Sequence, residues 1–525
     1  MEPQIRTLVD ISESQASLSG RADIVLERAR WASYIFQRFD KKRTMKIVDA
    51  VANVAHSHAG EWAEQVVVET GFGVVSHKKL KNEFTAKPLV DYYREQDLVS
   101  MRVKEEKKIV EIPRPAGVIF ALIPSTNPIS TLNFKIILAL ITRNSIVISP
   151  HPAAKKSCID AVRILTEAAI SSGAPEGAIQ VLENPSIPLI EEFMSSPKTN
   201  VILATGGTAM VRAAYSSSNP AIGVGPGNAP VFVDSSADIA LAANQIVTSK
   251  SFDNSVLCTS ESNLITLTDV DKPLRKSLKN QGAYICNNNE VVQIRNYLFH
   301  PNGFNVEALG RDAVWIAREC GIRVPKKTRI LVTPINSIGI EEPLAREKLC
   351  PVLSFYVANS PKQAIAQSRA TLRATGAGHS AVIHSQNERI ILDFASRVEC
   401  YRVVVNASCS LGASGFNTNL APSFTIGTGF YGRSSLGENL GPQHLIHWTQ
   451  IAYNSDPSVV FGKFNELSLS LDGPLPRSPS DGVPGSPKSR RVDTTSTSTS
   501  FSIDNVNREE LRKLIAEELK NVLKK

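Results

Sequence analysis

Two residues in the chain have the chemistry of a reactive site: a lone thiol and an amide at a predicted strand end. Cys258 lies in "SFDNSVLCTSES" (251–262), with no second cysteine spaced for a metal site. A thiolate is a strong nucleophile. An isolated cysteine in such a sequence is, however, more often a small buried hydrophobic residue. Asn127 follows an apolar run in "LIPSTNPIS" (122–130), which predicts a place at the ligand-binding edge of a sheet. The amide of Asn127 could donate a hydrogen bond to an oxyanion there. The alternative is that Asn127 is an ordinary turn residue.

Two glycine-rich stretches follow Asn127. "NVILATGGTAMVRAAYSS" (200–217) has the order strand, glycine turn, helix, which presents backbone N–H groups to a phosphate. The stretch lacks the GxGxxG motif of dinucleotide-binding loops, and a packed βα turn is an equally good interpretation of it. "AIGVGPGNAPVFVD" (221–234) precedes a strand, so we interpret it as a tight backbone approach.

The flanking segments predict the elements that position these residues. Residues 21–70 have helical periodicity, with Gly71 as a C-cap. From about residue 108, short β-rich runs alternate with helical stretches such as 153–173, and 445–454 is predicted to be a late strand. This alternation predicts a doubly wound α/β fold with a largely parallel sheet.

Composition narrows the class of protein. At 525 residues the chain is long enough for at least two domains, and its seven cysteines include no CxxC pair, so we expect neither a disulfide framework nor a metal site. The net charge of +8 is spread over interleaved acidic and basic residues, which favours a solvated surface over nucleic-acid binding. The sequence shows no signal peptide and no apolar run long enough for a membrane span. We therefore expect a cytoplasmic protein.

The C-terminal region has a different composition. Residues 465–502 are rich in Pro, Gly, Ser and Thr, which predicts a disordered linker. Residues 503–525 place apolar side chains on one helical stripe, which predicts an amphipathic docking helix. A homotypic coiled coil, a membrane-surface helix and a tail folded back on the body are the alternatives. The stripe consists of Leu511, Leu514, Ile515, Leu519, Val522 and Leu523.

Together, six segments over roughly residues 20–460 resemble the aldehyde dehydrogenase superfamily, and most closely its CoA-acylating branch, which includes acetaldehyde and propionaldehyde dehydrogenases. They are "STNP", "ATGGTAMV", "GVGPGNAPVFVD", "SFDNSVLCTSES", "EKLCPVLSFY" and "GFNTNLAPSFTIGTG". The resemblance implies that Cys258 is the nucleophile, that Asn127 and the Cys258 backbone N–H form the oxyanion hole, and that Glu347 binds the nicotinamide ribose. The other residues assigned to cofactor binding are Ser125, Thr126, His151, Pro152, Thr205, Gly206, Gly207, Thr208, Val224 and Gly225.

Two departures from the hydrolytic relatives bear on the reaction. Where those relatives carry a glutamate that activates water, this chain has Gly223, so the acyl group is expected to leave on CoA. Where they often carry a lysine that reaches the adenosine ribose, it has His151, which favours NAD over NADP, although Lys155 and Lys156 lie nearby. His379, in "GAGHSAVIHS", is the candidate proton carrier for thiolysis, and a structural histidine is the alternative that we favour.

The resemblance also implies an architecture. We expect an NAD-binding domain (1–98 and 115–231), an α/β catalytic domain (232–430) and bridging or oligomerisation strands (99–114 and 442–460). Such strands extend sheets between subunits in this family, which implies a homodimer or homotetramer. The tail is similar to the encapsulation peptides that load enzymes into bacterial microcompartments, so shell proteins are expected partners.

The predicted reaction joins a short aliphatic aldehyde, such as propionaldehyde or acetaldehyde, to CoA with reduction of NAD. A hydrolytic dehydrogenase that releases the free acid is one alternative. A catalytically silent homologue that scaffolds shell components is the other.

Overall fold

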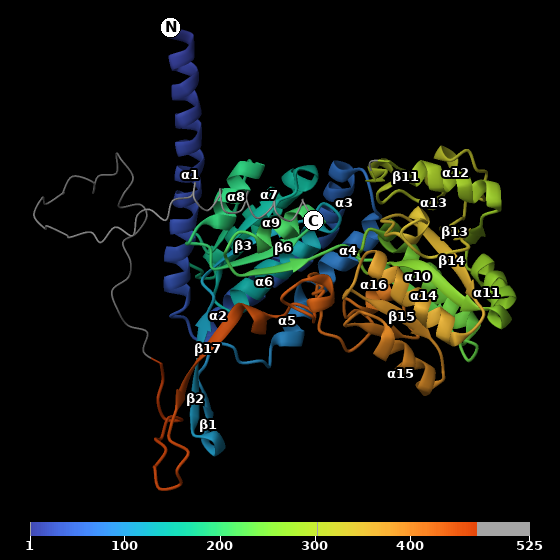
Figure 1. The fold of residues 1–525 in the computed structure, drawn as a ribbon. Coiled ribbons are helices and arrows are strands. Elements are labelled where there is room, and N and C mark those ends of the chain that lie inside the picture. The colour runs from blue at the N-terminus through green and yellow to red at the C-terminus, as the bar shows by residue number, and fades with distance from the viewer. Residues whose placement is uncertain (1, 302, 470–525) are drawn as a thin grey trace, which may run out of the picture. The chain divides into compact units, whose positions relative to one another are not determined.

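The computed structural model of the protein describes residues 2–301 and 303–469, with side chains of the first helix described from Leu18 onward. Two parallel sheets dominate this part of the chain, and a small antiparallel sheet adjoins the first of them (Figure 1). The predicted α/β fold is confirmed. Most of the predicted linker and all of the predicted docking helix lie outside the described residues.

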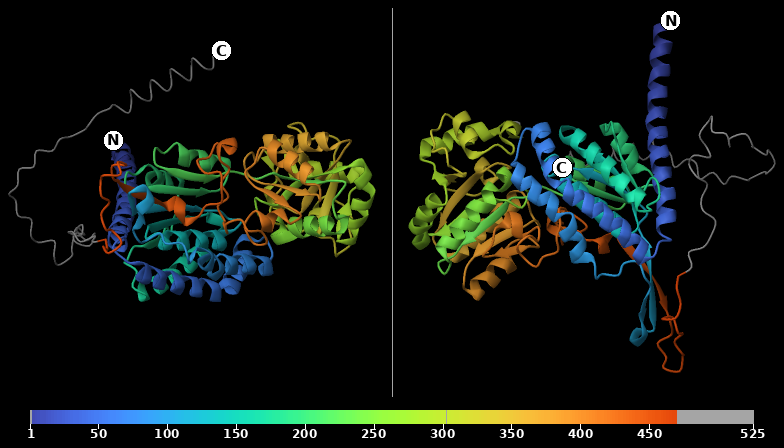
Figure 2. Two further views of the ribbon diagram at one scale, coloured as in Figure 1. Left: turned by 90° about the horizontal axis from the view of Figure 1, so that it is seen from below. Right: turned by 180° about the vertical axis from the view of Figure 1, so that it is seen from behind.

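The first sheet has five parallel strands in the order β5-β4-β3-β6-β7. Its strands are β3 (Val118–Ile123), β4 (Ser145–Pro150), β5 (Ile179–Val181), β6 (Val201–Thr205) and β7 (Ala221–Val224). Helices cover both of its faces, as Figure 2 shows from below and behind. One face packs against α2 (Lys41–Ser57), α3 (Ala59–Thr70), α5 (Lys87–Tyr93), α6 (Pro128–Ile141) and α7 (Lys155–Ser171). The other packs against α1 (Glu2–Phe36), α8 (Ile187–Ser195) and α9 (Thr208–Tyr215).

The central strand β3 shows why this sheet requires two helical layers. Val118, Phe120 and Leu122 face one hydrophobic cluster, while the alternate residues Ile119, Ala121 and Ile123 face the other. A strand buried on both faces is apolar throughout, as parallel sheets require. The predicted Gly71 cap is also confirmed: this residue ends α3 in the left-handed conformation, with φ of 73°.

The second sheet has seven parallel strands in the order β10-β13-β14-β9-β8-β15-β16. The strands are β8 (Ala229–Val233), β9 (Glu261–Leu267), β10 (Ala283–Ile285), β13 (Ile330–Pro334), β14 (Val352–Ala358), β15 (Ala381–His384) and β16 (Val403–Val405). The associated helices are α10 (Ile239–Ser251), α11 (Thr268–Asn280), α12 (Asn288–Leu298), α13 (Ala313–Glu319), α14 (Pro361–Ala374), α15 (Glu388–Arg397) and α16 (Cys409–Gly412). A two-stranded ribbon, β11 (Phe299–His300) and β12 (Gly303–Phe304), lies beside α12 and α13 (Figure 1).

The third sheet joins distant parts of the sequence. Strands β1 (Arg102–Lys104), β2 (Ile109–Pro115) and β17 (Ile446–Ala452) are antiparallel, with β2 in the centre. Strands β2 and β3 follow one another closely in the sequence but belong to different sheets. Gly117 separates them with φ of +120°, at a point where a Cβ atom would lie 2.4 Å from Asn200 Oδ1. The domain boundaries given above remain a prediction.

Candidate active site

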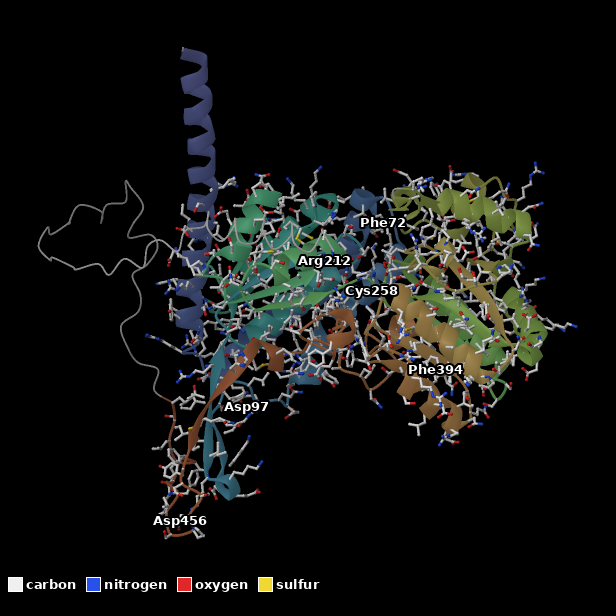
Figure 3. The ribbon with its side chains drawn as sticks, in the orientation of Figure 1. Phe72, Asp97, Arg212, Cys258, Phe394 and Asp456 are labelled. Carbon is white, nitrogen blue, oxygen red and sulfur yellow. The ribbon has the colours of Figure 1, made fainter. Side chains whose placement is uncertain are left out.

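A cavity of about 560 Å³ lies between the carboxyl ends of the first sheet and the loops of the second. Figure 3 places Cys258 where these two parts of the chain meet. All the predicted site residues except Thr208 and His379 line the cavity: Ser125, Thr126, Asn127, His151, Pro152, Thr205, Gly206, Gly207, Val224, Gly225, Cys258 and Glu347. A cavity of this size is within the range of small-molecule and cofactor sites.

Asn127 follows β3 and is the N-cap residue of α6, where Pro128 begins the helix. Its amide Oδ1 accepts a hydrogen bond from Lys81 Nζ. Its Nδ2 donates to Thr126 Oγ1 at 3.2 Å and to the Val256 carbonyl at 3.4 Å. The second of these bonds reaches the segment that carries Cys258. The fold thus brings together an amide and a thiol that are 131 residues apart in the sequence.

Cys258 lies in a turn between the 3₁₀ segment η3 (Phe252–Ser255) and the start of β9. It is partly exposed. The 221–234 stretch passes so close to it that a Cβ atom on Gly227 would lie 1.8 Å from the Cys258 carbonyl oxygen. Only glycine allows this contact, which is the tight backbone approach that the sequence predicts.

Burial dominates the electrostatics of the thiol. Desolvation, followed by the nearby Glu347 carboxylate, raises the pKa of Cys258 to about 12. The Glu347 carboxyl is itself buried, which raises its pKa to about 7, and its Oε1 accepts from the Gly227 backbone N–H at 3.0 Å. The resting site therefore holds a neutral thiol next to a carboxyl group that titrates near neutral pH.

The cavity fits a dinucleotide at the end of β6. Gly207 is the N-cap of α9, and no side chain bonds to this cap. A Cβ atom on Gly207 would meet nothing within 4 Å, so the backbone there is open to a phosphate. Two hydroxyls that line the cavity, Thr205 Oγ1 and Ser149 Oγ, are buried without a hydrogen-bond partner among the described residues. Unpaired buried hydroxyls favour a polar ligand because burial without a partner is costly.

Gly223 shows why the water-activating carboxylate has no place here. A Cβ atom at this position would lie 2.6 Å from Val211 Cγ1 and 2.7 Å from Tyr215 Cε2. The Gly223 N–H donates to Tyr215 Oη at 2.9 Å, and its carbonyl accepts from Ser434 Oγ at 2.9 Å. Packing against α9 and Ser434 thus fills the space that a larger residue needs.

The structure places His379 away from the cavity. The side chain is fully buried, and its Nδ1 is 3.1 Å from Ser380 Oγ. Burial, together with the nearby Arg402, lowers the pKa of His379 to about 3, so the imidazole is neutral. Arg402 donates to the carbonyls of His379, Gly378, Gly427 and Gly437, which ties three loops together.

Several polar residues at the site carry no recognisable signal in the sequence. Lys78, Lys81 and Asp253 form a buried cluster behind Asn127. The two lysines lie in the helix Val75–Phe84, a segment to which the sequence analysis assigns no element, so only three-dimensional contact identifies them. Ser149 was also missed, although it precedes the predicted residues His151 and Pro152 by two and three positions.

Two further properties concern the described residues only. Among them, no cluster of three or more His, Cys, Asp or Glu side chains is arranged to hold a metal ion. None of the helices described combines the length and the apolar character that crossing a membrane requires.

The parallel sheets and the cavity between them define an α/β protein with a cofactor-sized site. Residues 6–289 match the aldehyde dehydrogenase family. The succinate-semialdehyde dehydrogenase (acetylating) of Clostridium kluyveri is 33% identical, and the match covers 82% of this chain and 95% of that protein. The chain belongs to the aldehyde dehydrogenase family.

Another relative is longer. The aldehyde-alcohol dehydrogenase of Clostridium acetobutylicum is 40% identical over 424 residues, which cover 78% of this chain and 49% of that protein. The chain thus spans about half the length of this relative.

Solved structures agree with the fold. An acetylating aldehyde dehydrogenase from Geobacillus thermoglucosidasius superposes with a TM-score of 0.83 at 36% identity, covering 85% of this chain and 99% of that one. A propionaldehyde dehydrogenase from the Clostridium phytofermentans fucose utilisation microcompartment has a TM-score of 0.76 at 28% identity, with coverage of 83% and 98%. A propionaldehyde dehydrogenase from Rhodopseudomonas palustris with bound propionyl-CoA has a TM-score of 0.74 at 27% identity, with coverage of 82% and 94%.

Proposed function

We propose that this chain is a CoA-acylating aldehyde dehydrogenase, which converts a short aliphatic aldehyde, CoA and NAD⁺ into acyl-CoA, NADH and a proton. The observation that carries the proposal is the shared cavity in which Cys258 and Asn127 meet while Gly223 leaves no room for a water-activating carboxylate. Relatives whose names include "acetylating", and a related structure that holds propionyl-CoA, support it.

The mechanism begins with the thiol. Cys258 releases its proton to solvent and its sulfur adds to the aldehyde carbon, so the carbonyl π bond breaks and the oxygen becomes an oxyanion. Asn127 Nδ2 and the Cys258 backbone N–H stabilise this charge. Loss of a hydride from the same carbon re-forms the carbonyl bond and leaves a cysteinyl thioester; NAD⁺ would supply the hydride acceptor for this step. Thr205, Gly206, Gly207 and Thr208 would hold its phosphates. Glu347 would hold the nicotinamide ribose.

Release of the acyl group requires a second nucleophile. The CoA thiolate adds to the cysteinyl thioester, the carbon–sulfur bond to Cys258 breaks, and the cysteine leaves as a thiolate. Water is a much weaker nucleophile and needs a general base. Gly223 supplies none, so thiolysis is favoured over hydrolysis. For His379 we favour a structural role, because its side chain is buried outside the cavity lining; proton transfer in this step is the alternative.

The preference for NAD over NADP rests on the adenosine side of the cavity. His151 lines it, accepts from the Ala153 backbone N–H at 3.1 Å, and has a pKa lowered by burial. A neutral imidazole offers no positive charge to a 2′-phosphate. Lys155 is the next lysine along the chain, and its Nζ donates to Asn184 Oδ1 at 3.3 Å. This bond directs its charge to Asn184 and not to a 2′-phosphate.

The roles of the domains and the partners of the chain are proposed from its family resemblance. We assign NAD binding to the part of the chain around the five-stranded sheet and catalysis to the part around the seven-stranded sheet. The third sheet would bridge the subunits of a homodimer or homotetramer. Residues 503–525 would dock onto shell proteins of a bacterial microcompartment in the cytoplasm. The related microcompartment enzyme supports this last assignment.

Product analysis of the wild-type enzyme and a Cys258→Ala variant tests the proposed function. We expect wild-type enzyme with propionaldehyde, NAD⁺ and CoA to form propionyl-CoA and NADH in equal amounts. Cys258→Ala should lose at least about 10³-fold in rate, because the covalent route is closed. Formation of free propionate at the same rate without CoA would identify a hydrolytic enzyme. Absence of any NADH burst from the wild-type enzyme would favour a silent homologue.

A further inference from the structure

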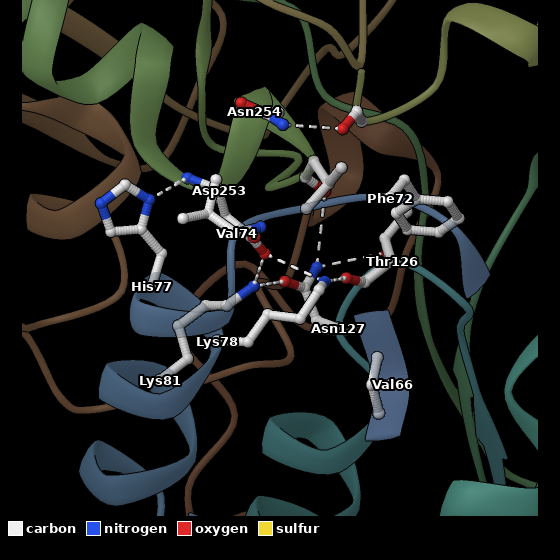
Figure 4. A network of polar contacts seen from close by, with 12 residues as sticks. Val66, Phe72, Val74, His77, Lys78, Lys81, Thr126, Asn127, Asp253 and Asn254 are labelled. Carbon is white, nitrogen blue, oxygen red and sulfur yellow. Dashed lines mark hydrogen bonds and ion pairs between the residues drawn. The ribbon is translucent and has the colours of Figure 1, made fainter. Parts of the chain in front are cut away.

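Two lysines of α4 (Val75–Phe84) and one aspartate form a buried charge cluster behind the proposed oxyanion hole (Figure 4). Lys78 Nζ lies 3.1 Å from Asp253 Oδ2, and Lys81 Nζ bonds to the same oxygen. The three side chains are between 0% and 4% exposed. A buried ion pair is weak evidence for stability, and a second lysine on one carboxylate adds a further desolvation cost. A contribution to stability therefore does not explain why a second lysine, Lys81, is buried in this cluster.

Asp253 belongs to the strained segment that leads to Cys258. Asp253, Asn254 and Ser255 are consecutive non-glycine residues in the left-handed conformation, with φ of 48°, 51° and 64°. Each such residue costs about 1–2 kcal/mol, and backbone strain of this kind concentrates at functional sites. The segment is held to the start of α4: Asp253 Oδ1 accepts from the Val74 N–H at 2.6 Å, and the Asp253 N–H donates to His77 Nδ1 at 2.9 Å.

Lys81 connects this segment to the amide of Asn127. In Figure 4 its ammonium group lies between Asp253 and Asn127, and it donates to Asn127 Oδ1. With Oδ1 occupied by a donor, Nδ2 must be the atom that faces Val256 and Thr126. Its bonds there, at 3.4 and 3.2 Å, are at or beyond the long end of the normal range. An oxyanion formed at Cys258 can therefore replace them at little cost.

We propose that Lys81, anchored by Asp253, is a positioning residue that fixes and polarises the Asn127 amide so that its Nδ2 donates to the oxyanion formed at Cys258. A cation on the amide oxygen withdraws electron density from the group and strengthens its N–H as a donor. The same Asp253 carboxylate fixes the segment that carries the nucleophile, so one buried pair aligns both partners of the addition step. The inference rests on the proposed function, because it assigns a role within that reaction.

A double-mutant cycle tests the inference. Lys81→Met should lower kcat for NADH formation by roughly 10- to 100-fold and change the KM for aldehyde by less than about threefold, because the amide acts on the transition state. In an Asn127→Ala background, the same substitution should have almost no further effect. Alkylation of Cys258 by iodoacetamide should stay within about twofold of the wild-type rate, because no oxyanion forms in that reaction.

Two neighbours on α4 provide matched controls. Lys78→Met removes a charge from the same carboxylate but leaves the Asn127 amide bonded to Lys81, since Lys78 contacts only the Thr126 carbonyl at 3.2 Å on that side. It should cost less than about threefold in kcat. Lys79→Met, at a side chain 53% exposed and paired with Glu83, should leave kcat unchanged. Lys81→Met retains the Lys78–Asp253 pair, so its fold is expected to survive. Lys81→Gln keeps a donor without the charge and tests the same position should the methionine variant fail to fold.

Three results would overturn the inference. One is an equal loss from Lys81→Met in the Asn127→Ala background. Another is a parallel loss of Cys258 alkylation, which would indicate a collapsed site. The third is a Lys78→Met loss as large as that of Lys81→Met, which would assign the effect to the charge of the whole cluster. A wild-type enzyme that forms no NADH from any aldehyde would contradict the proposed function instead, whatever the variants do.

Discussion

At the scale of single residues, the property of Cys258 that controls its reactivity is the pKa of its thiol. Desolvation raises the pKa of its thiol to about 12, so an empty site at neutral pH holds almost no thiolate. A partly exposed thiol with so high a pKa reacts slowly with oxidants and alkylating agents, because the thiolate is the reactive form. In the proposed reaction, a thiolate must therefore form from a neutral thiol before the sulfur adds to the aldehyde.

The alkylation of Cys258 should consequently depend steeply on pH. A thiol whose pKa lies far above the solution pH gains thiolate tenfold for each pH unit. Between pH 6 and pH 9, the iodoacetamide rate at Cys258 should therefore rise about tenfold per unit without a plateau, as measured by peptide mass spectrometry. Cys258→Ala supplies the blank for this peptide. A rate that levels off near pH 7 would show that the resting thiol has a low pKa.

Gly223 makes a packing prediction. A methyl group there meets Val211 and Tyr215 at 2.6–2.7 Å, so Gly223→Ala should lower the free energy of unfolding by about 1–3 kcal/mol in urea titrations. Gly223→Glu should be at least as unstable and should produce no free acid, because its carboxylate cannot reach the cavity without displacing α9.

Gly225→Ala is the matched control for this loop. A Cβ atom at Gly225 meets nothing within 4 Å, so its stability should stay within about 0.5 kcal/mol of the wild type. If Gly223→Glu folds normally and releases free acid without CoA, packing does not explain the absence of the carboxylate.

At the scale of elements, the sequence predicts those features that depend on neighbours along the chain. The strand, turn and helix at 200–217 form β6 and α9, and Gly71 ends α3, because periodicity and glycine geometry are local properties. The resemblance to a family assigned twelve of the residues that line the cavity, which is fewer than half of the lining. Lys81 and Asp253 escaped prediction because nothing local distinguishes a lysine that points inward from one that faces water. Their meeting depends on how α4 and η3 pack.

The C-terminal segment is predicted to act in docking and not in catalysis. Deleting residues 473–525 should leave kcat/KM within about twofold, because the cavity is lined by residues no later than Ile426. The same deletion should abolish co-purification with microcompartment shell proteins, because the predicted leucine stripe is lost.

A matched pair of substitutions refines that experiment. Leu514→Lys interrupts the predicted stripe, whereas Glu517→Lys changes a residue outside it, so only the first should reduce shell association. Entry of the truncated enzyme into shells would refute the docking role.

At the scale of the whole molecule, the third sheet presents an open edge. Within the described residues, β17 pairs with β2 alone, and Ile451 on this strand is 36% exposed. Val460, shortly after the strand, is 85% exposed. An unpaired strand edge beside apolar side chains is a surface for pairing with another chain. We therefore predict that the subunit contact of the proposed homodimer or homotetramer lies here.

Ile451→Lys should disrupt this assembly. A lysine on an edge strand opposes pairing by its charge and its hydration, and it removes the burial of an isoleucine side chain, worth about 1.5–3 kcal/mol. The dissociation constant of the oligomer should rise at least about tenfold, as measured by sedimentation equilibrium or light scattering across a concentration series. Val292→Lys, at a residue 49% exposed on α12, adds the same charge far from the third sheet along the chain and should leave the mass unchanged. An unchanged mass for both variants would exclude this edge as the subunit contact, and a shift for both would assign the effect to surface charge.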